Sequence, residues 1–371
     1  MDTTQIYGIV NEIASQAMGE KALTVVDAQG LIAMGNTVLS SSGNTEPFLN
    51  TLLQRIGRTI FSSRVYKNKF AMDNRSAMEW GAIVQKYSFV MPDAIEDPSY
   101  NLTEGQSVDQ WKVYKGEVKR KIFVSRTPFM FQLTTPRYQL KEAFTGAAEM
   151  GAFLSGRNTA VRNRIEKSLE DLGRTAHNNM IAENDTRAVN LVTLYNTEKG
   201  LSGDGALTAQ TAMLNDEFMR FSISVIKQYI DELTDFSKLH NDGTIERFTP
   251  VGRQKLKVLS RFERRLETTV QWAAFQKEMV SLYDYSTVNY WQAEQTPMNI
   301  NLERASDGTA KSITNIVATL SDVDSWGTYA EEEDVLTTPV NAVGAYYNTA
   351  WHMKPLYFND TSENFVYFTL N

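Results

Sequence analysis

The sequence lacks cysteine altogether, and it has only three histidines among 371 residues. Without cysteine the chain can form no disulfide, no thiolate metal site and no cysteine nucleophile. It also has no run of about 18 apolar residues, which predicts that no helix spans a membrane. The first residues include Asp2 and no basic segment ahead of an apolar one, so we expect no secretory signal. Packing alone must stabilise the chain, and we expect it to fold in a cytoplasm.

An excess of basic residues is absent as well. Lysine and arginine together number 37 against 44 aspartates and glutamates, which gives a net charge of −7. This balance argues against a chain that wraps nucleic acid over its whole surface, because such binding needs a basic field. A local basic patch stays open. The 42% apolar and 22% charged residues are typical of a chain that buries a core, and the length predicts two or three compact units.

Motifs of catalysis and of ligand binding are missing too. The histidines lie far apart in the sequence, and no H-E-x-x-H spacing is present. Gly146 and Gly151 have the spacing of a phosphate-binding loop, but Ala152 stands where that loop needs lysine. His177, in a predicted helix, and His352, in a predicted strand, are expected to be structural. We therefore predict no catalytic residue, no cofactor and no metal site.

The N-terminal residues are predicted to form an arm. Two amphipathic segments, 6–17 and 46–57, have the spacing of short helices, and Phe48 and Leu52 lie on the apolar face of the second. The stretch 40–44 between them favours a flexible link. Because neither segment is large enough to hold a core, we expect another surface to cover their apolar faces.

Residues 59–135 alternate between apolar and polar side chains over several stretches, which predicts β-strands. The polar segment 92–110 has no clear period and separates the last two stretches. A strand, a long loop and a returning strand make an extended hairpin. An isolated two-stranded ribbon is marginally stable in water, so this hairpin needs a neighbour.

Charge is unevenly distributed along the hairpin. The segment 92–110 has five acidic residues and neither lysine nor arginine, whereas the returning strand has six basic residues and one glutamate. Two interpretations stay open: complementary charges that set the register of one subunit on another, or a solvated loop beside an edge strand guarded by charge. The candidate contacts between subunits are Asp93, Glu96, Asp97, Lys119, Arg120, Lys121, Phe48 and Leu52.

The clearest helix is predicted over residues 157–183, where apolar residues recur every three or four positions from Val161 to Met180. A single apolar side predicts that this helix lies against a sheet. The charged residues expected to face outward are Arg162, Arg164, Lys167, Glu170, Asp171 and Arg174.

The second half of the chain mixes both kinds of element. Residues 188–195 have the pattern of a strand, and a loop at 200–210 leads into a second helix with an apolar stripe that includes Leu214. The segment after Phe248 gives both strand and helix signals. Strands are predicted from Gly344 onward and at the C-terminal end of the sequence.

Basic residues cluster between positions 253 and 265. One interpretation is a contact to the backbone of DNA or to an acidic strip on another subunit. The other is a solvated helix face, which is the commoner use of such a run. The candidate residues are Arg253, Lys257, Arg261, Arg264 and Arg265.

The order of these elements resembles the Hong Kong 97-type phage capsid fold, an α+β fold. In that family they are called the N-arm, the E-loop, the spine helix of the peripheral domain, the axial domain and the closing strands. The segments 48–57 and 344–352 are also similar to capsid proteins of small short-tailed phages of Gram-positive hosts. The resemblance implies this partition: N-terminal arm 1–58, E-loop hairpin and flanking strands 59–135, peripheral domain with spine helix 136–195, axial domain 196–340 and closing peripheral strands 341–371.

The resemblance implies a major capsid protein without catalytic chemistry. Copies of the chain would form hexamers and pentamers of an icosahedral head in the virion, assembled in the host cytoplasm. The head would enclose double-stranded DNA, contacted without sequence specificity. Scaffolding, portal and decoration proteins would be further partners, and no membrane would be involved. Contacts between the copies would be heterologous, and rings form where the rotation closes.

Three other interpretations stay open. An encapsulin-type nanocompartment shares the fold but holds protein cargo, so nucleic acid in purified particles would distinguish the two. A cytoplasmic enzyme with a site of scattered carboxylates would have a deep polar pocket and strongly shifted carboxylate pKa values. A tail or connector protein would form rings with a symmetry other than five or six.

Overall fold

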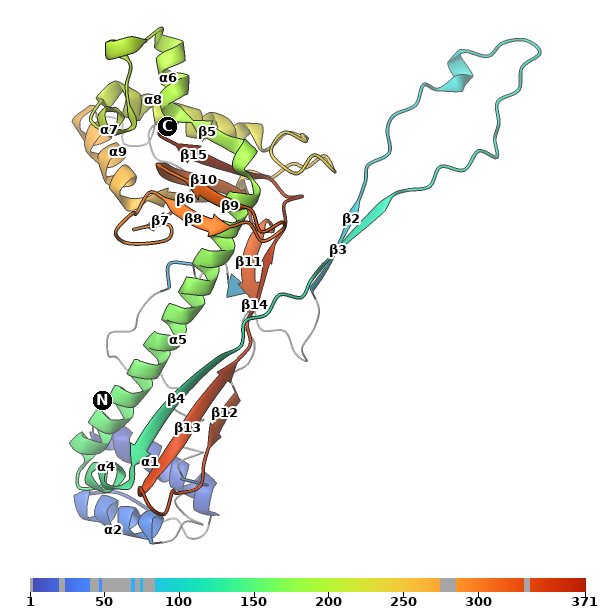
Figure 1. Cartoon of the computed structure of the whole chain (residues 1–371). Helices are drawn as coiled ribbons and strands as arrows, with labels where there is room; N and C mark the ends of the chain where they lie inside the picture. The colour runs from blue at the N-terminus through green and yellow to red at the C-terminus, as the bar shows by residue number, and fades with distance from the viewer. Residues whose placement is uncertain are drawn as a thin grey trace. The chain divides into compact units, whose positions relative to one another are not determined.

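The computed structural model describes residues 3–19, 24–40, 47–48, 68–70, 74–75, 84–273, 285–329 and 334–371. The chain combines helices with β-sheets and forms two compact units (Figure 1). Each unit is built from segments that lie far apart in the sequence. The first comprises Met1–Gly81, Arg126–Leu172 and Tyr329–Leu356, and the second comprises Ala82–Ser125, Gly173–Thr328 and Tyr357–Asn371. These units divide the chain at positions other than the boundaries expected at residues 58, 135, 195 and 340.

Three helices build one core of the first unit: α1 (Thr3–Met18), α2 (Ala28–Leu39) and α4 (Arg137–Ala143). Asp27 begins α2 as its N-cap, because its Oδ1 atom accepts the N–H of Gly30 at 2.7 Å. Asn11 of α1 makes two hydrogen bonds to the backbone of Val25, which tie α1 to the approach of α2. The core residues are Val10, Ile13, Ala14, Val25, Leu31, Met34, Val38, Phe48, Leu140, Ala143, Phe144, Met150 and Tyr347.

This core corrects the expectation for the N-terminal arm. The apolar faces of α1 and α2 pack against α4 within the same unit, so they need no cover from another surface. The prediction of α1 itself is confirmed, whereas the sequence analysis missed α2. Phe48 is fully buried beside Phe144, with the ring centroids 5.7 Å apart. Leu52 and most of the predicted helix 46–57 lie outside the described residues.

A three-stranded antiparallel sheet completes the first unit, in the order β12 (Asp334–Thr337), β13 (Tyr346–Met353) and β4 (Phe129–Pro136). Burial alternates along β13, as its predicted pattern of apolar and polar residues requires. One face packs against a long helix, where Trp351 and Met353 meet Ile165 and Leu169.

That helix, α5 (Ala147–Glu183), has 37 residues and begins before its predicted start. The predicted apolar stripe is buried over most of its length. Two charged residues expected to face outward are buried instead. The carboxylate of Glu170 accepts the N–H of Lys69 at 3.2 Å. The guanidinium of Arg174 lies 4.0 Å from the ring centre of Tyr290 and donates to the carbonyl of that residue. Such partners offset the cost of burying a charge.

The second unit is built on a five-stranded sheet in the order β5 (Ala188–Asn190), β15 (Phe365–Thr369), β10 (Ile316–Asp322), β6 (Gln254–Leu259) and β7 (Tyr285–Val288). The strands β15 and β6 run antiparallel to β10, whereas β5 and β7 run parallel to their neighbours. Every residue of β10 and β15 is buried. Continuous burial is typical of strands covered on both faces.

Helices cover both faces of this sheet. On one face, the Nε2 atom of His177 in α5 lies 2.9 Å from the hydroxyl of Thr319 in β10. On the other, Tyr229 of α8 (Asp216–Glu232) meets Phe368 of β15 with the ring centroids 5.5 Å apart. Burial, together with the nearby Lys257, lowers the pKa of His177 well below its ordinary value. This histidine is therefore a neutral packing residue.

Two expectations for the second unit need correction. Residues 188–195 are not one strand: β5 ends at Asn190, whose side chain accepts the N–H of Thr193 at 3.1 Å and so caps α6 (Leu191–Lys199). Leu214, expected on the second helix, precedes α8 and is exposed. The segment of mixed signals after Phe248 forms β6 and then α9 (Ser260–Ala273).

The remaining elements are short. The strands β8 (Ile300–Glu303) and β9 (Ala310–Ile313) form an antiparallel pair. The others are β1 (Asn74–Arg75), β11 (Trp326–Tyr329), β14 (Leu356–Asn359), α7 (Ala209–Ala212) and the 3₁₀ helices η4 (Asp185–Arg187), η5 (Gly203–Gly205) and η6 (Val251–Arg253). Within the described residues, no helix combines the length and the apolar character that crossing a membrane requires.

A candidate subunit interface on the β2–β3 hairpin

The predicted hairpin is formed by β2 (Val84–Phe89) and β3 (Val118–Phe123), which pair antiparallel in the second unit. Val90 donates its N–H to the carbonyl of Glu117 at 3.0 Å, and beyond this pair the chain opens into a long loop (Figure 1). The loop contains the short 3₁₀ helix η3 (Pro98–Tyr100). It is longer than predicted, so that Lys112 and Lys115 lie in it and not in the returning strand.

Every residue from position 91 to position 118 is exposed. Tyr100 and Trp111 have relative exposures of 86% and 81%. Large apolar side chains recur along the whole stretch: Met91, Ile95, Leu102, Val108, Val113, Tyr114 and Val118. So many exposed large apolar side chains in one segment make this loop a candidate contact site.

The two faces of the ribbon differ in character, and the usual pattern is inverted. The face with Tyr87, Phe89, Val118 and Ile122 is exposed although it is apolar. The opposite face is charged, with lysines at positions 86, 119 and 121, and it is the half-buried one. A half-buried ribbon normally turns its apolar face to its own core and its polar face to water. The inversion makes the apolar face a candidate contact surface.

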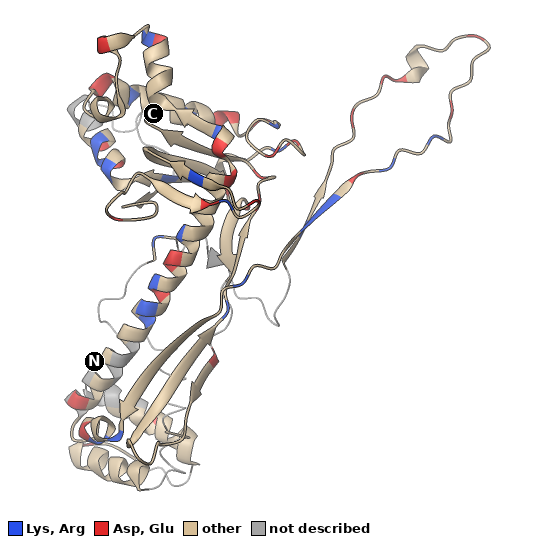
Figure 2. Cartoon of the chain, viewed as in Figure 1, with Lys and Arg blue, Asp and Glu red and all other residues tan. Residues whose placement is uncertain are grey.

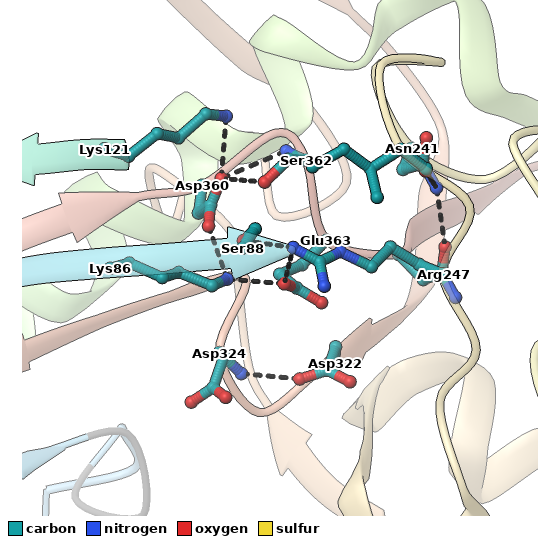
Figure 3. Close-up of polar contacts among 12 residues, drawn as sticks. Lys86, Ser88, Lys121, Asn241, Arg247, Asp322, Asp324, Asp360, Ser362 and Glu363 are labelled. Carbon is teal, nitrogen blue, oxygen red and sulfur yellow. Dashed lines mark hydrogen bonds and ion pairs between the residues drawn. The ribbon is translucent and has the colours of Figure 1, made fainter. Parts of the chain in front are cut away.

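The charged face is bound to the body of the second unit through ion pairs (Figure 3). The Nζ atom of Lys86 lies 2.5 Å from Asp360 Oδ2 and 2.5 Å from Glu363 Oε1. The Nζ atom of Lys121 lies 2.8 Å from Asp360 Oδ1 and 3.4 Å from Asp242 Oδ2. We call this group of residues, together with Arg247, the hairpin seat.

Arg247 completes the hairpin seat. It donates to the hydroxyl of Ser88 in β2 at 2.5 Å and lies 3.3 Å from Glu363 Oε1. Burial alone would raise the pKa of Asp360, but the charges and hydrogen bonds of Lys86 and Lys121 outweigh it and lower that pKa to about 2. Burial raises the pKa of Glu363, and Lys86 and Arg247 offset this only in part. The pKa values of the two buried carboxyls are therefore shifted in opposite directions from their ordinary values.

The acidic residues predicted as subunit contacts lie in the exposed loop. Asp97 caps η3 by accepting the N–H of Ser99 at 2.9 Å, and this hydrogen bond lowers the pKa of Asp97. Glu96 accepts a hydrogen bond from Asn101. Asp93 is exposed in the same loop. Figure 2 shows acidic positions spread along the loop and basic positions concentrated on β3.

The basic residues that were predicted as subunit contacts lie on different faces of the ribbon and have different partners. Arg120 lies on the exposed face, with its guanidinium carbon 5.8 Å from the ring centre of Tyr87. Lys119 donates to the carbonyl of Thr244 at 3.0 Å. Lys121 belongs to the hairpin seat and forms ion pairs within its own chain. Alternation along a strand explains this split, since adjacent residues point to opposite faces.

The basic cluster at 253–265 is likewise divided. Arg253 of η6 pairs with Asp322 at 3.3 Å and with Asp324. Lys257 of β6 is 2% exposed, so the expectation that it meets DNA or another subunit is wrong for the folded chain. Arg264 pairs with glutamates of its own helix, including Glu267 at 2.7 Å. The exposed remainder of the cluster is Arg261 and Arg265 on α9.

Most of the hairpin seat could not be predicted from the sequence. Lys86 stands in a strand pattern that gives no hint of an ion pair, and its partners Asp360 and Glu363 follow it by more than 270 residues. The one signal was the polar turn between two C-terminal strands, where two acidic residues are three positions apart. In the described part of the chain, no group of three or more potential ligand side chains is placed to hold a metal ion. The candidate site is the exposed apolar face of the β2–β3 ribbon together with the loop between the two strands.

The sequence and the fold are similar to those of several phage proteins. The sequence matches the model of the Phi29-like phage major capsid protein family over residues 9–369. The major capsid protein of Bacillus phage GA-1 is 26% identical over 168 residues, which cover 44% of this chain and 34% of that protein. The chain thus matches about a third of the length of this curated relative.

Two solved structures share the fold. A chain in the capsid structure of Staphylococcus phage Andhra aligns with a TM-score of 0.54 at 10% identity, over 84% of this chain and 87% of that one. A chain in the structure of the head fiber and inner core protein gp22 of native bacteriophage P68 aligns with a TM-score of 0.52, also at 10% identity and over the same shares. The expected α+β fold of the Hong Kong 97 type is confirmed. With a family match that spans nearly its whole length, the chain belongs to the Phi29-like phage major capsid protein family.

Proposed function

We propose that this chain is the building subunit of a phage head, in which its copies form hexamers and pentamers of an icosahedral shell around double-stranded DNA. The observation that carries the proposal is the hairpin, because its apolar face and its loop stay in water in a single copy. Family membership supports the same role.

A second copy is the partner that the hairpin requires. Covering an aromatic side chain such as Tyr100 or Trp111 contributes roughly 1.5–3 kcal/mol each, so the whole loop supplies a large driving force once a neighbour covers it. The hairpin of one copy would meet a different surface of the next, which is a heterologous contact. Such contacts close into rings of five or six when the rotation allows, and the rings build a shell.

Contact with packaged DNA would be local and independent of sequence. Arg261 and Arg265 on α9 are exposed and lie one helical turn apart. Within the described residues they have no ion-pair partner. Their charges are therefore available to phosphate groups, while the net charge of −7 keeps DNA from coating the rest of the chain.

The rival interpretations are weaker. The family match favours a phage head over a nanocompartment for protein cargo and over a tail or connector protein. The carboxylates of the hairpin seat are paired with Lys86, Lys121 and Arg247, so they serve as ion-pair partners in this proposal, and the proposed role includes no catalytic step. Scaffolding, portal and decoration proteins belong to the proposal as further partners of the shell.

Electron microscopy of the purified chain tests the proposal. We expect shells from the full-length chain, alone or with a scaffolding protein, and nucleic acid in particles taken from infected cells. A variant in which a two-residue Asn-Gly turn replaces residues 91–116 should keep the β2–β3 pair and fold, yet form no shells. Persistent monomers of the unaltered chain under all these conditions, or full shells without the loop, would refute the role assigned to the hairpin.

A further inference from the structure

The inner face of the hairpin contacts the body of its unit through an aromatic pair and a group of ion pairs. At the base of the ribbon, Phe123 meets Phe358 with the ring centroids 5.5 Å apart. Farther along, the inner face is held by the hairpin seat. These ion pairs include charge-assisted hydrogen bonds, whose geometry is restricted, so a ribbon held by several of them has a defined angle. Removal of one partner from a buried pair is strongly destabilising.

We propose that Asp360 is a positioning residue that fixes the angle of the hairpin through Lys86 and Lys121, and thereby places the loop for contact with the neighbouring copy. This inference rests on the proposed function, because the angle matters only if the loop has a neighbour to meet.

The register of the ribbon makes Asp360 central. Lys86 and Lys121 are direct partners across the two strands. Like charges directly opposite each other destabilise an antiparallel pair. The two oxygens of Asp360 are divided between these lysines, Oδ2 to Lys86 and Oδ1 to Lys121, so one carboxylate relieves the repulsion and clamps both strands.

Asp360 is itself held rigidly. Its side chain is fully buried, and its Oδ1 atom also accepts the N–H and the hydroxyl of Ser362 at 3.1 and 2.6 Å. The turn that carries it is joined to the loop of Asp242, since Asp242 donates its N–H to the carbonyl of Thr361 at 2.9 Å. The acceptor groups of the hairpin seat are therefore held in place by hydrogen bonds that do not involve the lysines.

The other groups of the hairpin seat contact both strands of the ribbon. Glu363 and Arg247 bind the β2 side of the ribbon, through Lys86 and Ser88. Asp242 binds the β3 side, through Lys121. Contacts on both strands resist rotation of the ribbon about its own axis, which a single ion pair would permit. Removal of both lysines leaves Asp360 buried without its cations, so we expect the ribbon to lose its fixed angle.

Spin labels measure that angle directly, because a chain without cysteine can be labelled at two chosen sites. Val118→Cys places one label on the exposed face of the ribbon, and Ser224→Cys places the other on the exposed side of α8. In the otherwise unaltered monomer we expect one narrow distance between the labels. In the variant Lys86→Gln with Lys121→Gln, we expect that single narrow distance to be lost.

Two further variants serve as controls. Lys112→Gln with Lys115→Gln removes the same charge from the hairpin but outside the hairpin seat, and should leave the distance narrow. Lys86→Arg with Lys121→Arg keeps both cations and should restore it. Asp360→Asn should broaden the distance as the double lysine variant does, although it also perturbs the turn at Ser362. An unchanged narrow distance in the Lys86→Gln, Lys121→Gln variant overturns the proposal, as does equal broadening in the Lys112→Gln, Lys115→Gln control.

Shell assembly is then measured separately by electron microscopy. We expect the variant without the seat lysines to form shells at roughly one tenth of the normal yield or less, since breaking a buried pair costs more than tenfold in an equilibrium. Normal shell yield despite a broadened distance would overturn the role of Asp360 in assembly. If the unaltered chain forms no shells, the proposed function fails, and the label distances still decide whether Asp360 fixes the hairpin.

Discussion

Two regions of the second unit contain many aromatic and β-branched residues, yet they differ in burial. All residues of β10 and β15 are buried, whereas all residues from 91 to 118 are exposed. The chain covers the sheet itself, with α5 on one face and α8 on the other. The described residues supply no such cover for the hairpin loop. Apolar content alone therefore does not tell whether a surface is covered by its own copy, and for the exposed loop we propose cover by a neighbouring copy.

The largest expected effect concerns the sheet. Phe365→Ala in β15 removes a fully buried ring, and we expect the free energy of unfolding of the monomer to fall by about 3–5 kcal/mol. Urea denaturation measures this loss. Phe89→Ala on the exposed face of β2 is the matched control, and it should change the same quantity by about 0.5 kcal/mol or less. Equal losses of unfolding free energy in the two variants would show that the ribbon face is packed as tightly as the sheet.

The next effect concerns the junction between the two regions. The pKa of Asp360 falls from 3.8 to about 2 in the folded chain, which corresponds to about 2 kcal/mol of stability at neutral pH. Because this pKa is lowered, the contribution is present above the unfolded value and is lost as the pH falls toward 2. We expect Asp360→Asn to destabilise the monomer at pH 7 but to match the unaltered chain near pH 2, in urea titrations at a series of pH values.

Glu363 sharpens that test, since its raised pKa has the opposite sign. The folded chain binds the proton of Glu363 more readily than the unfolded chain does, so protonation of this carboxyl favours folding as the pH falls. Glu363→Gln should therefore cost less at pH 7 than Asp360→Asn. A larger loss of unfolding free energy from Glu363→Gln than from Asp360→Asn would contradict the assignment of Asp360 as the central acceptor. Both carboxyls belong to the hairpin seat, whose other charged groups, Lys86, Lys121, Arg247 and Asp242, are the same in both variants.

A still smaller effect on the monomer is expected in the loop. Trp111→Ala with Tyr100→Ala should leave the free energy of unfolding unchanged within about 0.5 kcal/mol, because both side chains are exposed. The same variant should assemble poorly, as sedimentation velocity would show. A monomer clearly destabilised by these substitutions would mean that the loop packs on its own chain.

The smallest effect on the chain itself is expected on α9. Arg261→Gln with Arg265→Gln should change neither the stability of the monomer nor the yield of shells. It should weaken retention of DNA in particles as salt is raised, because fewer phosphate groups are neutralised. Glu267→Gln, which removes a charge from the same helix, is the control. An identical salt response in both variants and in the unaltered particle would exclude a DNA contact at these arginines.

Local patterns were enough to predict the long helix, the hairpin and the terminal strand. Each has a period or an alternation that is complete within its own segment, as the buried stripe of α5 shows. Partners far apart in the sequence could not be predicted this way. Phe48 has an apolar helical spacing, but nothing near it reveals Phe144, which buries it.

The candidate site shows the same division. The loop itself was predicted, because a long polar stretch between two strand patterns indicates a hairpin loop. The face on which each lysine lies follows from alternation, but which face meets the body depends on Asp360 and Glu363, more than 230 residues away. The ion pairs of Lys121 with Asp242 and Asp360 were therefore not predicted. Burial of Lys257 was missed because a basic run shows no sign of where a strand ends and a helix begins.

Hydrogen exchange of the loop in the two states of the protein tests the central claim most directly. We expect amides between positions 91 and 118 to exchange freely in the monomer and to become protected in assembled shells, while amides of β10 and β15 are protected in both. Loop amides that exchange as fast in shells as in monomers, or that are already protected in the monomer, would contradict the claim.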